Sequence, residues 1–224
     1  MNKQDVIEFF DRAASSWDAE MIKNDVIIEK ILDNVEIEAG QDVLDVACGT
    51  GDFTIEIARK IAAGSKIIGI DLSEGMMAVG RKKIAAANID ATLEYGDCEA
   101  LKYSDNTFDR ISVGFGVRNF EHLQTGLKEM CRVLKPNGKL VILELSVPSN
   151  PLLRWCYKLY FLNILPAIGG FVSGDRSAYE YLPASVLNFP APEKFIPMMH
   201  QAGFAKVEHK ALTFGICRMY IGIK

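Results

Sequence analysis

The sequence predicts an α/β fold in which helices cover both faces of a mostly parallel sheet. Segments typical of strands and of helices alternate from residue 42 onward, and a glycine-rich turn at 49–51 joins the first such strand to the first helix. Acidic residues stand at or just beyond the ends of three predicted strands. Strands and helices that alternate in this way build a parallel sheet, and ligands bind outside the carboxyl ends of its strands.

The predicted elements follow the periodicity of the apolar residues. Helical spacing predicts two helices ahead of the sheet, over residues 4–14 and 20–34. The sheet region then comprises, in order, strand 42–46, helix 52–61, strand 66–70, helix 74–87, strand 91–95, strand 108–113, helix 123–134 and strand 139–145. The run Lys135-Pro136-Asn137-Gly138 ends the last of these helices and predicts a turn before the strand.

After residue 146 the alternation stops. Asn150 and Pro151 predict the start of a helix over 152–163 that is apolar on nearly all sides, with Arg154 and Lys158 as its main charges. The remaining predicted elements are helices at 177–187 and 193–201 and two closing strands at 205–210 and 213–223.

The composition fits one globular domain. The 224 residues are 49% hydrophobic and 24% charged with a net charge of −4, so we expect no nucleic-acid partner. The 5 cysteines and 3 histidines show no metal-ligand spacing, so we expect no metal; the scattered cysteines are typical of reduced thiols in a cytoplasmic protein. The polar N-terminus is not a signal peptide, and no apolar stretch is long enough to cross a membrane.

The glycine-rich turn predicts a nucleotide-type cofactor site. Gly49 and Gly51 have no Cβ, so the backbone turns tightly and a ligand approaches closely. A dinucleotide fingerprint requires a third glycine where this chain has Thr54, and Asp52 stands where a pyrophosphate would approach. S-adenosylmethionine has no phosphate and carries a positive sulfonium and ammonium. The turn therefore favours S-adenosylmethionine over a nicotinamide dinucleotide.

Three acids support the same prediction. Asp45, Asp71 and Asp97 are spaced 26 residues apart and each falls at or just past a predicted strand end. One such acid alone is explained equally well as a helix cap. Three acids beside a glycine turn, at the edge where parallel strands end, favour ligand contact.

Several motifs occur in the order known from one family. They are Asp45-x-Ala47-Cys48-Gly49-Thr50-Gly51-Asp52, Phe115-Gly116-Val117-Arg118-Asn119, Arg132-Val133-Leu134-Lys135-Pro136-x-Gly138, Ala178-Tyr179-x-Tyr181-Leu182-Pro183-x-Ser185-Val186 and Leu212-Thr213-Phe214-Gly215-Ile216. Over nearly its whole length the chain resembles the demethylmenaquinone methyltransferases, which share a family with the C-methyltransferases of ubiquinone synthesis. Many methyltransferases share the glycine turn, whereas the Phe-Gly-x-Arg-Asn and Tyr-Leu-Pro segments are specific.

The resemblance implies a class I methyltransferase fold, a Rossmann-like sheet of seven strands with an antiparallel last strand. We therefore predict a single methyltransferase domain, residues 1–224, that consists of an N-terminal helical cap (1–40), a cofactor-binding core (41–146), a helical substrate or lid segment (147–203) and closing strands (204–224).

The resemblance also implies which residues bind S-adenosylmethionine. The predicted contacts are Asp45, Gly49, Thr50, Gly51, Asp71, Asp97 and Cys98. Asp71 offers two acceptor oxygens to the ribose hydroxyls, and Asp97 accepts from the adenine amino group beside Cys98. Some relatives have a serine where this chain has Gly114, so no contact is expected there.

The implied reaction moves a methyl group to a ring carbon of demethylmenaquinol, a naphthoquinol with a prenyl tail. Alternative acceptors are the ubiquinone precursor 2-polyprenyl-6-methoxy-1,4-benzoquinol and another small molecule. Ring carbon becomes nucleophilic when the neighbouring phenol, whose pKa is about 10, loses its proton. We predict that Arg118 stabilises the phenolate and that Asn119 orients the ring. Tyr179, Asp97 and a water held by an acid are the candidate bases.

The apolar helix predicted at 152–163 has two interpretations. It is either an ordinary core or dimer helix, or a surface that shelters a prenyl tail and touches the inner face of the cytoplasmic membrane. The sequence leaves both interpretations open, together with the homodimer that the first of them allows.

Overall fold

The computed structural model describes residues 2–15, 33–60, 65–161 and 176–224, except for the side chains of 176–180. Seven strands in this part of the chain form one sheet in the order β3-β2-β1-β4-β5-β7-β6. The strands are β1 Asp42–Val46, β2 Lys66–Asp71, β3 Thr92–Tyr95, β4 Phe108–Gly114, β5 Leu134–Leu145, β6 Lys206–Leu212 and β7 Cys217–Ile223. β1 to β5 are parallel, and β7 runs antiparallel to β5 and β6. The predicted fold class is confirmed.

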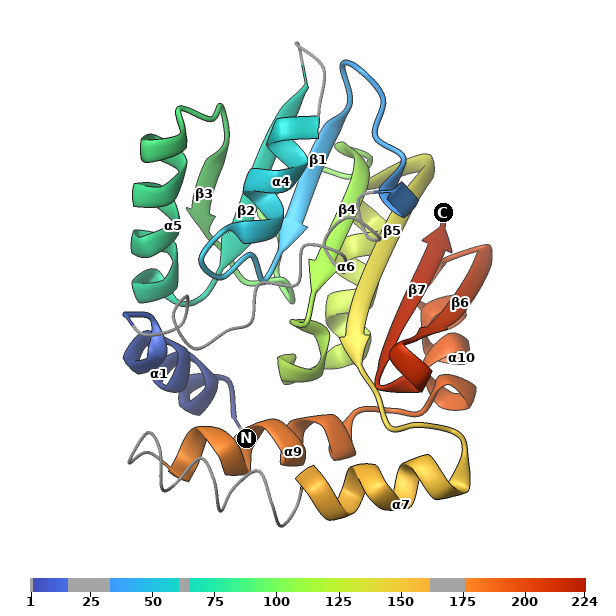
Figure 1. The fold of residues 1–224 in the computed structure, drawn as a ribbon. Coiled ribbons are helices and arrows are strands. Elements are labelled where there is room, and N and C mark those ends of the chain that lie inside the picture. Colours follow the sequence, from blue (N-terminus) through green and yellow to red (C-terminus); the bar gives the residue numbers. More distant parts are fainter. Residues whose placement is uncertain (1, 16–32, 61–64, 162–175) are drawn as a thin grey trace.

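Helices cover both faces of this sheet and the end where its parallel strands stop (Figure 1). The described helices are α1 Lys3–Ala13, α4 Asp52–Lys60, α5 Glu74–Ala87, α6 Leu123–Val133, α7 Pro151–Leu159, α9 Arg176–Asn188 and α10 Pro192–Ala202, with short 3-10 turns η1 Val117–Asn119 and η3 Thr213–Gly215. Figure 1 shows α4 in front of the sheet and α6 behind it, while α1, α7 and α9 lie across the carboxyl ends of the strands. None of the described helices is both long and apolar enough to span a bilayer.

The core explains why the central strand β1 is buried along nearly its whole length. Every residue of β1 after Asp42 is buried, because the strand has helices on both sides. Leu44 and Val46 belong to the cluster packed on α6 and α10, whereas Val43 packs with Ile57 of α4 on the opposite face. The two layers hold the carboxyl ends of the strands in place beneath the loops that follow them.

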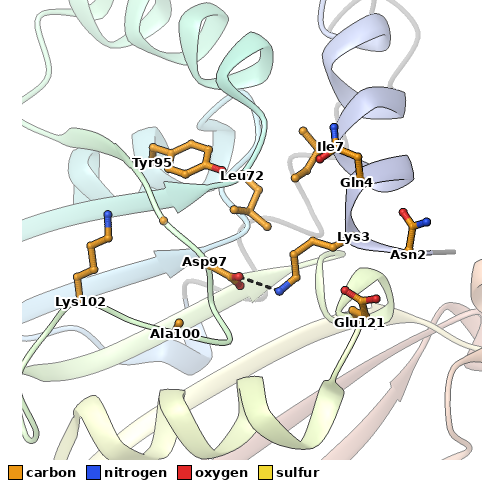
Figure 2. A pocket seen from close by; sticks show the side chains of 11 residues that line it. Asn2, Lys3, Gln4, Ile7, Leu72, Tyr95, Asp97, Ala100, Lys102 and Glu121 are labelled. Carbon is orange, nitrogen blue, oxygen red and sulfur yellow. Dashed lines mark hydrogen bonds and ion pairs between the residues drawn. The ribbon is translucent and has the colours of Figure 1, made fainter.

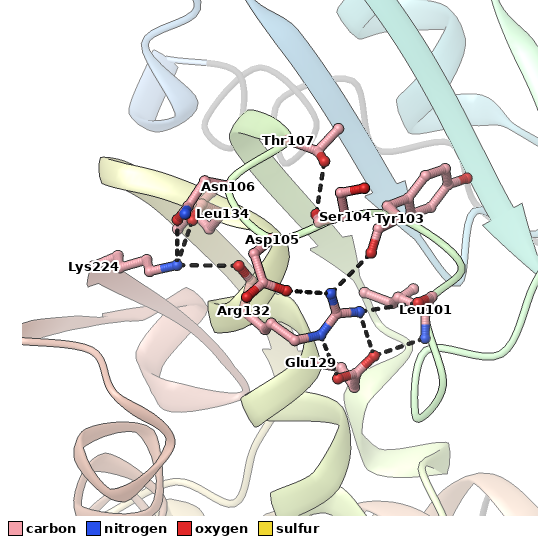
Figure 3. A network of polar contacts seen from close by, with 10 residues as sticks. All are labelled: Leu101, Tyr103, Ser104, Asp105, Asn106, Thr107, Glu129, Arg132, Leu134 and Lys224. Atoms are coloured by element: carbon pink, nitrogen blue, oxygen red, sulfur yellow. Dashed lines mark hydrogen bonds and ion pairs between the residues drawn. The ribbon is translucent and has the colours of Figure 1, made fainter.

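Arg132 fixes the loop after β3 to α6 (Figure 3). Its guanidinium donates to the carbonyls of Leu101 and Tyr103 at 3.0 and 2.8 Å, and it forms ion pairs with Glu129 and Asp105, both at 2.8 Å. This loop begins directly after β3, where the predicted contacts Asp97 and Cys98 stand. The arginine of the Arg-Val-Leu-Lys-Pro motif therefore has a structural role that positions the site.

Several predicted boundaries differ from the observed ones. The turn predicted at 135–138 lies inside β5, where the register with β4 shifts between the pairs Phe108–Leu134 and Arg110–Lys139 and Asn137 adopts a φ of 62°. The helix predicted at 152–163 is described only as far as 161, and α7 ends at Leu159. Most of the helix predicted at 20–34 lies outside the described residues.

The strand predicted at 213–223 is wrong over its first four residues. Thr213–Gly215 form the turn η3, in which Phe214 has a φ of 57°, and β7 begins at Cys217. Ser146 holds this turn, because its hydroxyl donates to the carbonyl of Gly215 at 2.7 Å and its N–H donates to the carbonyl of Ile216 at 2.8 Å. These tertiary bonds override the local preference for a strand.

Candidate active site

A cavity of about 1000 Å³ opens at the carboxyl ends of the parallel strands. Its walls come from the loops after β1, β2, β3 and β4, with α1 and α9 on the remaining side. Of the predicted site residues, the structure brings together Gly49, Thr50, Asp71, Asp97, Cys98, Arg118 and Asn119 in the lining. Tyr179 belongs to α9, but its side chain lies outside what the structure describes.

Asp45 lies outside the cavity lining, contrary to the expected contact with the ligand. Its carboxylate is buried and accepts hydrogen bonds from Thr54 Oγ1 at 2.6 Å and Ser112 Oγ at 2.8 Å. Gly69 of β2 pairs with Asp45, and a Cβ at Gly69 would lie 2.8 Å from the Thr54 hydroxyl. The threonine that replaces the third glycine of a dinucleotide fingerprint is therefore a partner of Asp45 in the interior.

The buried Asp45 carboxyl makes folding depend on pH. Burial raises its pKa from 3.8 to about 6, although the hydrogen bonds from Thr54 and Ser112 oppose this rise. Because protonation then favours the folded state, its contribution to the free energy of unfolding is greatest below about pH 4 and decreases by about 3 kcal/mol as the pH rises to about 6. Unfolding of the wild type and of Asp45→Asn between pH 4 and 7 measures this difference. A difference that does not change with pH would contradict it.

The glycine turn has the tight geometry that its sequence predicts. Ala47, Gly49 and Gly51 all have positive φ, at 55°, 55° and 76°, and the N–H of Gly51 donates to the carbonyl of Cys48 at 2.8 Å. Gly51 does not line the cavity, since it is buried against Leu93, whose Cδ1 would lie 3.5 Å from an added Cβ. Gly51 thus serves the turn itself, while Gly49 and Thr50 face the ligand space.

Asp71 connects the end of β2 to this turn. One carboxylate oxygen accepts from the N–H of Gly49 at 2.9 Å and the other from the N–H of Ser73 at 2.8 Å. Burial raises the pKa of Asp71, and these backbone hydrogen bonds oppose the rise. Among the described lining residues, Asp71 is the one carboxylate without an ion-pair partner. It therefore keeps acceptor capacity and charge for a ligand.

Three of the other acids of the lining are less negative than the sequence suggests, because lysines neutralise them. Lys83 Nζ lies 2.6 Å from Asp52, and Lys3 Nζ lies 2.7 Å from Asp97 and 3.1 Å from Glu99. Figure 2 shows Lys3 reaching from α1 to Asp97, at the edge of a neighbouring cavity of about 560 Å³. Repulsion of a phosphate by Asp52 is consequently a weaker argument than the sequence alone indicates.

Arg118 is held from several directions. Its Nη1 lies 2.7 Å from Glu144, which also accepts from the Arg118 backbone N–H at 3.0 Å, and its Nε donates to Ser185 Oγ at 3.2 Å. Nη1 also donates to the carbonyl of Phe115. The side chain of Arg118 is 6% exposed and that of Glu144 is 0% exposed. Glu144 thus fixes the position of the guanidinium and balances its charge, which the sequence did not reveal.

Tyr181, which the sequence left as either a wall of the acceptor pocket or a core aromatic, lines the cavity. Its hydroxyl donates to Asn119 Oδ1, and its ring lies 4.7 Å from that of Phe9 and 6.2 Å from that of Phe10. Burial raises the pKa of Tyr181 to about 12, while the charge of Arg118 opposes the rise. A hydroxyl with this pKa stays protonated near pH 7 and acts as a hydrogen-bond donor.

Gly114 has a packing explanation. A Cβ at this position would lie 2.4 Å from Cε2 of Phe53, whose ring also lines the cavity. The ring of Phe53 therefore takes the space that a side chain at position 114 would need.

The chain is similar in sequence to proteins of one family. A model of the ubiE/COQ5 methyltransferase family matches residues 1–224. The "Ubiquinone/menaquinone biosynthesis C-methyltransferase UbiE" of Geobacter sulfurreducens is 48% identical over 187 residues, which cover 83% of this chain and 73% of that protein. The "Demethylmenaquinone methyltransferase" of Shouchella clausii is 42% identical over 85% of this chain and 81% of its own length.

Solved structures share the fold at low identity. A SAM-dependent methyltransferase from Aquifex aeolicus has a TM-score of 0.63 at 17% identity and covers 100% of this chain and 98% of its own. Phosphoethanolamine N-methyltransferase 2 of Haemonchus contortus, in complex with S-adenosyl-L-methionine, has a TM-score of 0.68 at 15% identity, over 89% of this chain and 52% of its own. These likenesses confirm the methyltransferase architecture of the sheet.

Proposed function

The chain belongs to the ubiE/COQ5 methyltransferase family, and from that premise we propose that it transfers a methyl group from S-adenosylmethionine to a ring carbon of demethylmenaquinol, which gives menaquinol. The observation that carries the proposal is the meeting of two groups of residues in one cavity. The glycine turn and Asp71 come from the ends of β1 and β2, and Arg118, Asn119 and Tyr181 come from η1 and α9. The printed names of the relatives supply the acceptor.

The lining fits S-adenosylmethionine by its donors and acceptors. Asp71 offers carboxylate oxygens that no cation of the described chain neutralises, as the two hydroxyls of a ribose require. Asp97 and the backbone beside Cys98 stand next to the apolar side chains of Ile70 and Leu72, a setting suited to an adenine ring. When bound, S-adenosylmethionine supplies an electrophilic methyl group on a positively charged sulfur.

The residues around Arg118 are suited to an oxygen-bearing aromatic acceptor. Within the described part of the chain, Arg118 forms its contacts through Nε and Nη1, which leaves Nη2 as the donor for a developing phenolate. Asn119 and Tyr181 form a polar pair beside the rings of Phe9 and Phe10, which supply an apolar wall for the acceptor ring. Because Tyr181 stays protonated near pH 7, it orients the acceptor rather than removing its proton. Asp97, Tyr179 and a water held by an acid remain the candidate bases.

Removal of the Tyr181 hydroxyl tests this role. We expect Tyr181→Phe to lower kcat for methyl transfer by about 5- to 30-fold, the effect of losing one hydrogen bond of about 1–2 kcal/mol, with cofactor affinity unchanged. Tyr103→Phe is the matched control, since it removes a hydroxyl that bonds Glu94 outside the cavity. Equal kcat values for Tyr181→Phe and the wild type would remove Tyr181 from the reaction.

Incubation with methyl-labelled S-adenosylmethionine tests the proposed function as a whole. Purified protein is mixed with reduced demethylmenaquinone in detergent, and we expect labelled menaquinone well above the background of an Arg118→Ala variant. Product no greater than that background would contradict the proposal. The relative from Geobacter sulfurreducens is named for ubiquinone as well as menaquinone synthesis, so 2-polyprenyl-6-methoxy-1,4-benzoquinol is tested in parallel. The acceptor that yields more labelled product identifies the substrate.

The proposed acceptor also predicts where in the cell the protein acts. A prenylated quinol resides in the bilayer, so an enzyme that methylates it works at the inner face of the cytoplasmic membrane.

A further inference from the structure

Exposed apolar side chains gather on one helix beside the active site. Five of the large exposed apolar residues of the described chain belong to α7 or its C-terminal cap: Leu152, Leu153, Trp155, Leu159 and Tyr160. Leu152 is 69% exposed and Trp155 is 63% exposed. Single exposed apolar residues are common, but a group of this size on nine residues of helix and its C-terminal cap marks an interaction surface.

Phe214 stands next to the segment that leads into this helix. It is 85% exposed and has a φ of 57°, a conformation that a bulky residue rarely adopts. The turn that carries Phe214 packs on this segment, since a Cβ at Gly215 would lie 3.4 Å from Cα of Pro148. Ser146 bonds the same turn through its hydroxyl. We define the apolar patch as Leu152, Leu153, Trp155, Leu159 and Tyr160; Phe214 is a further exposed apolar residue, on the turn that packs against the segment before α7.

The opposite side of α7 anchors the helix to the protein. Tyr157 is its buried residue, and the ring of Tyr157 stacks on that of Phe161 at 4.2 Å. Burial raises the pKa of Tyr157 to about 12. Arg154 fixes the start of the helix by donating to the carbonyls of Pro148 and Ser149 at 3.0 and 3.1 Å.

The segment that carries the patch is positively charged, whereas the whole chain is negatively charged. The protein carries a net charge of −4, yet the sequence from 145 to 174 contains no Asp or Glu and has Arg154 and Lys158 as its cations. Each cation near an anionic bilayer contributes about 1 kcal/mol to binding. Trp and Tyr beside leucines and basic residues are typical of a helix that lies in the membrane interface. Between two copies of the patch, by contrast, the cations of both would be brought together.

We propose that the apolar patch docks the protein on a bilayer of anionic phospholipid, with α7 lying in the interface. This inference rests on the proposed function only in that a prenylated acceptor resides in such a bilayer. Figure 1 shows α7 and α9 at the end of the sheet where the parallel strands stop, which is where the cavity opens. Docking through α7 therefore brings the cavity toward the lipid.

Sedimentation with vesicles tests the docking surface. We expect the full-length protein to bind vesicles of phosphatidylcholine and phosphatidylglycerol, to bind pure phosphatidylcholine at least 10-fold less, and to be released by high salt. The double variant Leu152→Ser, Trp155→Ser should lose at least 10-fold in binding to the anionic vesicles. Tyr95→Ser, which removes an apolar side chain of 54% exposure at the end of β3, is the matched control and should bind like the wild type.

Two results would overturn the inference. One is equal vesicle binding by the wild type and the double variant when both have the same melting temperature. The other is a wild type that does not bind vesicles but sediments as a dimer that the double variant dissociates, because the patch would then be an interface between two copies.

A paired assay separates this inference from the proposed function. The double variant should methylate demethylmenaquinol dissolved in detergent but lose at least 10-fold in rate on the same acceptor embedded in vesicles. If the wild type binds vesicles yet methylates no quinol in detergent, the docking surface stands and the proposed acceptor is wrong. If the wild type methylates the quinol in detergent but binds no vesicles, the proposed acceptor stands and the docking surface is wrong.

Discussion

Asp71→Ala is expected to weaken the binding of S-adenosylmethionine by about 1–3 kcal/mol, or about 5- to 150-fold in Kd. The reason is that Asp71 is the lining carboxylate to which no described cation is paired, and its oxygens stand beside the glycine turn. The loss of a buried acceptor leaves the partner hydroxyls of the ribose without hydrogen bonds. Titration calorimetry with S-adenosylmethionine measures the change directly.

Two further variants separate ligand contact from local structure. Asp71→Asn keeps one oxygen for the N–H of Gly49 or Ser73 but loses the charge, and we expect an intermediate loss of affinity. Asp90→Ala is the control, since this exposed acid lies outside the cavity lining. An unchanged affinity of Asp71→Ala would mean that the ribose lies elsewhere.

Glu144→Gln is expected to lower the free energy of unfolding by about 3–5 kcal/mol, because it leaves the guanidinium of Arg118 buried without its counter-charge. It should also abolish most of the methyl transfer, since Glu144 accepts from both the backbone and the side chain of Arg118. Unfolding in urea measures the first effect, and the labelled-methyl assay measures the second.

The double variant Glu144→Gln, Arg118→Met provides the critical comparison. Removal of both charges takes away the unpaired ion, so the double variant should be more stable than Glu144→Gln alone, although it remains inactive. If the loss of stability of the double variant relative to the wild type instead equals the sum of the losses of the two single variants, the two residues do not act as a pair.

The sequence predicted the sheet and the edge that carries the site, because both depend on local patterns. Apolar periodicity marked the strands, and the left-handed turn around Gly49 is a property of the residues that form it. Asp71 lies at the carboxyl end of β2 and lines the cavity, as its position in the sequence predicts. Asp45 has the same local signal but is satisfied by Ser112, 67 residues away in the chain, so its inward placement depends on the packed fold.

The sequence could not predict which charged side chains of the site form ion pairs. Lys3 and Asp97 are 94 residues apart, and Lys83 and Asp52 are 31 apart, so their pairing depends on how α1 and α5 meet the loops. The predicted apolar helix at 152–163 was likewise ambiguous. Its composition is apolar on nearly all sides, and only the fold shows that Tyr157 is buried while Trp155 is exposed.

A crystal structure with S-adenosylhomocysteine tests most directly whether the large cavity is the cofactor site. We predict density along the glycine turn, with the ribose hydroxyls within hydrogen-bond distance of the Asp71 carboxylate and the adenine beside Asp97 and Cys98. Density confined to the smaller cavity on the far side of the Lys3–Asp97 ion pair, or none under conditions where NADH fills the glycine turn, would contradict the assignment.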